Sequence, residues 1–173
     1  MPPLSSVSTV LAQSGVDVNV DLSLIDSALA LVGSGVAAFL TTLALGALLV
    51  AFAPDYTDRL TAAVTDEPSD SALYGVFFLL ALVVLTVALV VTIIGIFVAV
   101  PLVLLAYVVW SFGSAVAFLA VGERLVGDED GWFKPLLVGA AINGALTFTG
   151  VGGIISFVVG ATGFGAILKD RFA

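Results

Sequence analysis

Three long stretches of the chain are almost entirely apolar and contain no charged residue. They cover residues 27–54, 71–122 and 135–168. A helix rises about 1.5 Å per residue, so about 20 apolar residues cross the roughly 30 Å of hydrocarbon in a bilayer. The first stretch is long enough for one crossing, whereas the other two are too long for one crossing and must turn back. The pattern therefore predicts an all-α integral membrane protein.

The second stretch needs a break near its middle. Gly95 and Pro101 are the residues there that disfavour a continuous helix, because glycine is flexible and proline lacks an amide donor. We expect one helix over 73–94 and another over 101–121, joined by an apolar turn or continuing as a kinked pair.

A glycine-rich segment divides the third stretch. Gly150 and Gly152 lie in this segment and permit a tight turn. Two short helices are expected, over 135–148 and 153–168. Because each is short for a full crossing, the pair forms either two thin spans or a re-entrant hairpin.

These breaks predict a bundle of about five transmembrane helices in a single domain over residues 27–170. The predicted spans are 27–53, 73–94, 101–121, 135–148 and 153–168. Residues 1–26 precede the domain as an extracytoplasmic segment.

Two segments outside the spans have patterns of their own. Residues 16–24 alternate between apolar and polar with the period of a half-buried strand. Because a lone strand is unstable in water, they form either a strand with a partner or an extended lead-in to the first span. Residues 55–70 place Leu60 and Val64 on one helical face, and Pro68 ends the pattern. This predicts a short amphipathic helix on the membrane surface.

Composition and charge narrow the class of protein. Of the 173 residues, 61% are hydrophobic and 10% are charged, whereas soluble domains average about 25% charged residues. This excludes a soluble enzyme and a nucleic-acid-binding protein, and makes the lipid bilayer the expected surrounding. The net charge of −8 suits a high-salt cell such as that of halophilic archaea, where acidic surfaces stay hydrated.

The five basic residues predict the orientation in the membrane. All five fall on one side of the predicted bundle, and residues 1–26 carry none. Since cytoplasmic loops are rich in Lys and Arg, we expect a multi-pass protein of the plasma membrane with its N-terminus outside and its C-terminus in the cytoplasm. The candidate interfacial anchors are Arg59, Arg124, Trp132, Lys134 and Lys169.

Small residues mark candidate helix-packing surfaces. Gly33 lies in the first span. Gly153, Gly160 and Gly163 form a stripe along the last helix, where small residues let helix backbones approach closely. The stripe packs either within the chain or between the chains of a homo-oligomer. Asn143 is the one amide inside the predicted spans, and we expect it to hydrogen-bond to a neighbouring helix, with a pore-lining or ligand-binding role as the alternative.

The groups that chemistry inside a membrane requires are missing from the predicted spans. They contain no Asp, Glu, Lys, Arg or His, and the whole chain has neither His nor Cys. Proton relays, coupled transporters and intramembrane proteases need such groups. We therefore expect no enzyme activity, no cofactor and no metal site.

Three short motifs resemble a known membrane module. They are the run Thr92-Ile-Ile-Gly-Ile96, the pair Ala106-Tyr107 and the exit Gly122-Glu-Arg-Leu125. In these motifs, and in the order of its elements over about residues 27–170, the chain resembles the multi-span domain attached to, or encoded near, bactofilin-type polymer-forming cytoskeletal proteins of bacteria and archaea. The resemblance implies association with a polymer-forming scaffold and implies no chemistry.

Two functions fit a protein of this kind. The first is a non-catalytic membrane scaffold or anchor that works through its cytoplasmic segments, residues 55–70 and 122–134. The second is a small oligomeric channel or uncoupled transporter that uses the glycine turns and Asn143. The resemblance and the uncharged spans both favour the scaffold.

Overall fold

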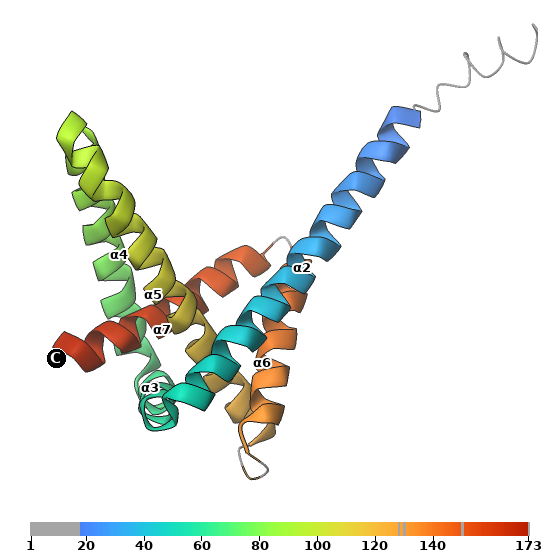
Figure 1. Cartoon of the computed structure of the whole chain (residues 1–173). Helices are drawn as coiled ribbons and strands as arrows, with labels where there is room; N and C mark the ends of the chain where they lie inside the picture. The colour runs from blue at the N-terminus through green and yellow to red at the C-terminus, as the bar shows by residue number, and fades with distance from the viewer. Residues whose placement is uncertain (1–17, 128, 130, 150, 173) are drawn as a thin grey trace, which may run out of the picture. The chain divides into compact units, whose positions relative to one another are not determined.

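A computed structural model describes residues 18–127, 129, 131–149 and 151–172, and these residues form six helices with no strand among them (Figure 1). The helices are α2 (Val18–Phe52), α3 (Pro54–Asp66), α4 (Pro68–Val90), α5 (Ile93–Val126), α6 (Phe133–Leu146) and α7 (Gly152–Phe172). The predicted all-α class is therefore confirmed.

Among the described residues, four helices, rather than the five predicted, reach the length of a membrane span. The segments that are long and apolar enough are Ile25–Phe52, Pro68–Val90, Ile93–Val126 and Gly152–Arg171. Helix α6 is apolar but has only 14 residues. Its length of about 21 Å is less than the roughly 30 Å of hydrocarbon in a bilayer.

The chain divides into two compact units, residues 1–33 and 34–173. In the first unit the structure describes residues 18–33, which are helical and belong to α2. The strand or extended lead-in predicted over 16–24 is therefore wrong from residue 18 onwards, and most of the predicted segment 1–26 lies outside the described residues. A helix satisfies its own backbone hydrogen bonds, whereas an isolated strand leaves them unpaired. The contacts described below lie within the second unit.

Prolines begin α3 and α4. Pro54 and Pro68 are the first residues of these helices, where no intrahelical bond needs the missing amide hydrogen. Only Glu67 separates the two helices, and the Ser71 hydroxyl donates to the Ala63 carbonyl across the junction at 3.3 Å. Pro68 therefore follows the end of the amphipathic helix, as predicted, and also begins the next helix five residues earlier than expected.

The long second stretch breaks at residues 91–92, earlier than predicted. The Thr92 hydroxyl accepts from the Gly95 amide at 3.0 Å and donates to the Leu89 carbonyl at 2.9 Å, so it caps α5. A Cβ on Gly95 would lie 2.0 Å from the Leu89 carbonyl oxygen, so the turn requires glycine there. Pro101 lies inside α5, and the prediction that it forms the turn is wrong. The Thr92 cap starts the helix, and the proline then removes only one of its hydrogen bonds.

The glycine-rich segment separates α6 from α7, as predicted. Gly152 begins α7, and a Cβ there would lie 1.5 Å from the Leu146 carbonyl oxygen. Gly150, the other predicted turn residue, lies outside the described residues. Helix α7 continues to Phe172, beyond the predicted end at residue 168. The two helices of the predicted hairpin therefore differ, because α7 reaches the length of a span and α6 does not.

The core of the second unit lies where α3, α5 and α7 meet. Helices α4 and α5 pack against α7, α6 packs against α5, and α3 packs against both α5 and α7. The buried cluster consists of Leu60, Val64, Val116, Ala117, Ala120 and Ala166. This cluster lies near one end of α5 and α7, and the functional features described next surround it.

Candidate functional site

Glycines make very close helix contacts in the second unit. A Cβ added to Gly163 of α7 would lie 1.8 Å from the Gly113 carbonyl oxygen of α5, and a Cβ added to Gly160 would lie 2.8 Å from the Trp110 ring. These two predicted packing residues therefore pack within the chain. Gly153 meets no described atom within 4 Å and is not part of this contact. Gly33 belongs to the first unit, and its packing role stays a prediction.

Other close contacts involve glycines that sequence reasoning missed. Gly122 of α5 lies against the α6 backbone, and Gly139 of α6 lies against the α5 backbone. Ser71 and Gly75 of α4 lie against the α7 backbone. The signal that could have found the α4 contact is the spacing of its two small residues four positions apart, which is typical of close helix crossings in membranes.

The apolar face of α3 is buried inside the protein. Leu60 and Val64 are only 1% and 8% exposed and belong to the core cluster. Thr57 and Thr61 are also buried, and their hydroxyls donate to carbonyls four residues earlier, at 2.9 and 2.7 Å. The face that the sequence assigned to the membrane surface therefore packs against α5 and α7.

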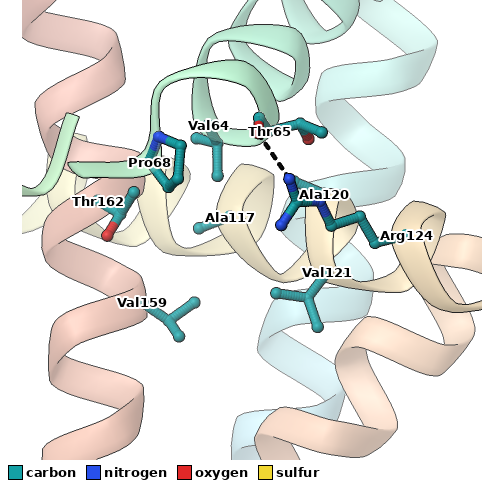
Figure 2. A pocket seen from close by; sticks show the side chains of 9 residues that line it. All are labelled: Val64, Thr65, Pro68, Ala117, Ala120, Val121, Arg124, Val159 and Thr162. Carbon is teal, nitrogen blue, oxygen red and sulfur yellow. Dashed lines mark hydrogen bonds between the residues drawn. The ribbon is translucent and has the colours of Figure 1, made fainter. Parts of the chain in front are cut away.

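Two basic side chains tie the junction of α3 and α4 to the rest of the unit. The Arg124 guanidinium of α5 donates to the Thr65 carbonyl at 2.8 Å (Figure 2). The Lys169 ammonium of α7 pairs with the Glu67 carboxylate and lies 4.0 Å from that of Asp70. Two of the predicted interfacial anchors thus have partners within the chain.

The other predicted anchors are exposed. The Arg59 guanidinium donates to the Asp55 carbonyl at 3.3 Å and lies 5.7 Å from the centre of the Tyr56 ring. Trp132 directly precedes α6 and is 42% exposed, and Lys134 is exposed in the first turn of that helix. The contact of these side chains with a membrane interface stays a prediction.

Exposed carboxylates cover α3 and its junction with α4. These residues, here called the acidic face, are Asp55, Asp58, Asp66, Glu67 and Asp70. Burial raises the pKa of the neighbouring Tyr56 phenol above its ordinary value of 10.0, and the Asp170 carboxylate raises it further, while Arg59 and Arg171 lower it. The end of α7 therefore contributes to the electrostatics of the same region.

A hollow of about 170 Å³ lies beside the hydrogen bond between Arg124 and Thr65 (Figure 2). Its lining residues are Val64, Thr65, Pro68, Ala117, Ala120, Val121, Arg124, Val159 and Thr162. One guanidinium faces mostly aliphatic walls, and the Thr162 hydroxyl donates to the carbonyl of Val158 in its own helix. Among these lining residues there is no carboxylate and no pair of nucleophile and base, and no three His, Cys, Asp or Glu side chains of the described chain come together as metal ligands.

Asn143 joins three helices. Its side-chain nitrogen donates to the Thr42 hydroxyl of α2 at 2.8 Å, and its side-chain oxygen accepts from the Ser156 hydroxyl of α7 at 3.2 Å. The predicted hydrogen bond to a neighbouring helix is therefore confirmed, and a second one accompanies it. Thr42 is only 4% exposed, so the α2 end of this polar junction is buried.

Comparisons with known proteins place the chain in a family. No curated protein matches the chain, and no solved structure matches it. The family model that matches covers residues 4–173, which is nearly the whole chain. The chain belongs to the family described as "Domain of unknown function (DUF8173)".

Proposed function

We propose that the protein is a non-catalytic membrane scaffold or anchor, which crosses the plasma membrane several times and holds a partner on the acidic face. The observation that carries the proposal is the construction of this face. Its five carboxylates are exposed, while Leu60 and Val64 on the other side of α3 are buried.

The support beneath the acidic face distinguishes it from a loosely attached surface helix. The Arg124 and Lys169 side chains hold the α3–α4 junction from two other helices. A surface that is already ordered loses less conformational entropy when a partner binds. The arrangement therefore suits a stable attachment point.

The chemistry of the acidic face selects a basic partner. Complementary charge speeds encounter and suppresses wrong partners more than it adds raw affinity. The resemblance to the multi-span domain of bactofilin-type proteins supports a polymer-forming cytoskeletal protein as the partner.

The distribution of basic residues supports a cytoplasmic location of this face. Arg59 lies in α3, Arg124 in the last turn of α5, and Lys169 in the last turn of α7. Cysteine substitutions at Ser6 and Ser69 test the orientation in intact cells, because the chain has no cysteine of its own. An impermeant thiol reagent should label the first and not the second, and the opposite pattern would overturn the orientation.

Cross-linking tests the partner. A photoreactive residue replaces Thr65 at the edge of the acidic face in the full-length protein, and cross-linked species are recovered from cells. We expect one polymer-forming protein, lost when Asp55, Asp58 and Asp66 are all changed to Asn. Asp26→Asn removes a carboxylate outside the acidic face and should leave the cross-link intact.

The alternative function, a small oligomeric channel or uncoupled transporter, has a separate test. The purified protein in liposomes is assayed for the flux of neutral solutes and of ions. A solute-selective flux that disappears in Asn143→Leu would overturn the scaffold proposal.

A further inference from the structure

A second hollow, of about 270 Å³, lies among α2, α5 and α6 and is here called the polar groove. Its lining residues are Ala37, Ala38, Thr41, Thr42, Leu45, Tyr107, Trp110, Ser111, Ser114 and Asn143. Seven of these ten side chains carry an N–H or O–H group. In the hollow of about 320 Å³ between α2, α3, α5 and α7, only Tyr56 carries one. The polar lining therefore sets this groove apart.

The polar groove lies about midway along α2 and α5, and its α6 residue, Asn143, is three residues from the end of that short helix. Thr42 is ten residues from the end of α2, Asn143 is ten residues from the start of α6, and Ser114 is twelve residues from the end of α5. These separations correspond to about 15–18 Å along a helix, which is about half of the roughly 30 Å hydrocarbon layer. In a membrane the groove is therefore surrounded by lipid rather than by bulk water.

Three of the residues that line the groove carry a polar group that makes no hydrogen bond within the described part of the chain. These groups are the Thr41 hydroxyl, the Ser114 hydroxyl and the Trp110 indole N–H. Helix hydroxyls commonly donate to the carbonyl four residues earlier, as Ser111 does to Tyr107 at 2.8 Å. Unsatisfied polar groups are costly in hydrocarbon, so the groove requires an occupant that supplies hydrogen-bond partners.

We infer that the polar groove binds water and other small, neutral hydrogen-bonding molecules inside the membrane. Apart from the Tyr107 phenol, its lining has no ionisable side chain, so nothing there compensates the charge of an ion. One water takes up about 30 Å³ in the liquid, so the groove has room for several. The inference rests on the membrane placement in the proposed function and is independent of the scaffold partner.

Single cysteines introduced into the cysteine-free chain report where water reaches. Thr41→Cys and Ser114→Cys, each in the full-length protein in liposomes, are treated with a small water-soluble methanethiosulfonate. This reagent reacts with the thiolate, which forms only where water is present. The controls Leu40→Cys and Val108→Cys lie on the same helices, exposed and outside the groove. We expect the two groove cysteines to react at least tenfold faster than the controls.

Three other patterns of cysteine reactivity would overturn the inference or the membrane placement on which it rests. Equally slow reaction at all four positions overturns the inference, because hydrocarbon then fills the groove. Oxidation of Ser114→Cys chains into a disulfide dimer also overturns it, because a second copy then closes the groove. Equally fast reaction at all four positions overturns the membrane placement itself, whatever the scaffold partner is.

A second measurement uses no cysteine. The chain has two tryptophans, so Trp132→Phe leaves Trp110 in the groove as the only fluorophore of this kind. We expect acrylamide to quench its emission, and the added changes Thr41→Val and Ser114→Val to reduce that quenching at least twofold. Quenching that is unaffected by these changes would contradict a water-filled groove.

Discussion

Two stretches of α5, here called its outer and inner halves, are both mainly apolar but have different surroundings. In the outer half, residues 93–108, most side chains are exposed, with Ile93 at 83% and Phe97 at 80%. In the inner half, residues 113–122, Val116 and Ala117 are completely buried. Neither of these two ranges contains a charged residue, since Glu123 and Arg124 follow only after the second, so charge within them cannot account for the difference.

Residue size separates the two halves. Five of the ten inner residues are Gly or Ala, whereas the outer half consists mainly of branched and aromatic residues. The small residues Gly95 and Ala99 are the buried ones in the outer half. Lipid tails are as apolar as leucine, so helices associate in a membrane through close packing rather than through the hydrophobic effect. In α5, small residue size rather than apolarity therefore distinguishes the segment that packs against protein.

The largest expected effect comes from enlarging a glycine at the α5–α7 crossing. The Cβ of Gly163→Ala would lie 1.8 Å from a backbone oxygen, so we expect the free energy of unfolding to fall by about 3 kcal/mol. Gly153→Ala on the same helix meets open space and should be neutral or stabilising by up to about 1 kcal/mol. Unfolding in mixed micelles, followed by circular dichroism, measures both. Equal losses in the two variants would break the comparison.

Truncating one leucine in each half of α5 tests the comparison directly. Leu119 is 1% exposed and Leu104 is 60% exposed. We expect Leu119→Ala to lower the free energy of unfolding by about 2–4 kcal/mol because it leaves a cavity, and Leu104→Ala to lower it by less than about 0.5 kcal/mol. A large loss in Leu104→Ala would show that the outer half is covered by a partner rather than by lipid.

The Asn143 junction tests whether polar contacts add to the packing of the inner region. Asn143→Leu removes the hydrogen bonds to Thr42 and Ser156 while keeping the branched side-chain skeleton, and should cost about 1 kcal/mol. A double-mutant cycle with Thr42→Val measures the part that belongs to the α2 contact. A coupling energy of zero would mean that this hydrogen bond contributes nothing to stability.

A smaller effect on stability is expected from removing the ion pair between Lys169 and Glu67. Its side chain is 27% exposed and that of its partner Glu67 is 58% exposed, so water screens the pair. Lys169→Met should lower the free energy of unfolding only slightly, because water screens the ion pair, and the loss should shrink as salt is added. Arg171→Met, in the same helical turn, is the control. A loss that is insensitive to salt would indicate that packing of the lysine stem, not its charge, matters.

The smallest effect concerns the ionisation of Tyr56. With Tyr74→Phe and Tyr107→Phe it is the only tyrosine in the chain, and a spectrophotometric titration should give a pKa above 10.0, because burial disfavours the phenolate. The unfolded chain loses this proton first as the pH rises. The stability from Tyr56 is therefore complete below pH 10.0 and is lost between there and the folded pKa. A midpoint at or below 10.0 would contradict the burial.

The positions of the helix breaks could be predicted only in part from the residues near them in the sequence. Sequence reasoning identified Gly152 correctly, because glycine between two apolar helices permits the tight turn that separates them. Sequence reasoning also identified Gly95, but it predicted Pro101 as a turn residue as well, and Pro101 lies inside α5. The choice depends on the Thr92 cap and on the approach of the Leu89 carbonyl, which are contacts that hydropathy does not record.

The sequence by itself determined the all-helical class, the apolar segments and the role of Asn143 as a link between helices. Each follows from the residue itself or from its near neighbours along the chain. Only the tertiary structure decided that Gly163 packs while Gly153 does not, that the apolar face of α3 rests on α5 and α7, and that Arg124 has a partner within the chain. These contacts join residues far apart in the sequence, so their presence depends on how whole helices cross rather than on any local pattern.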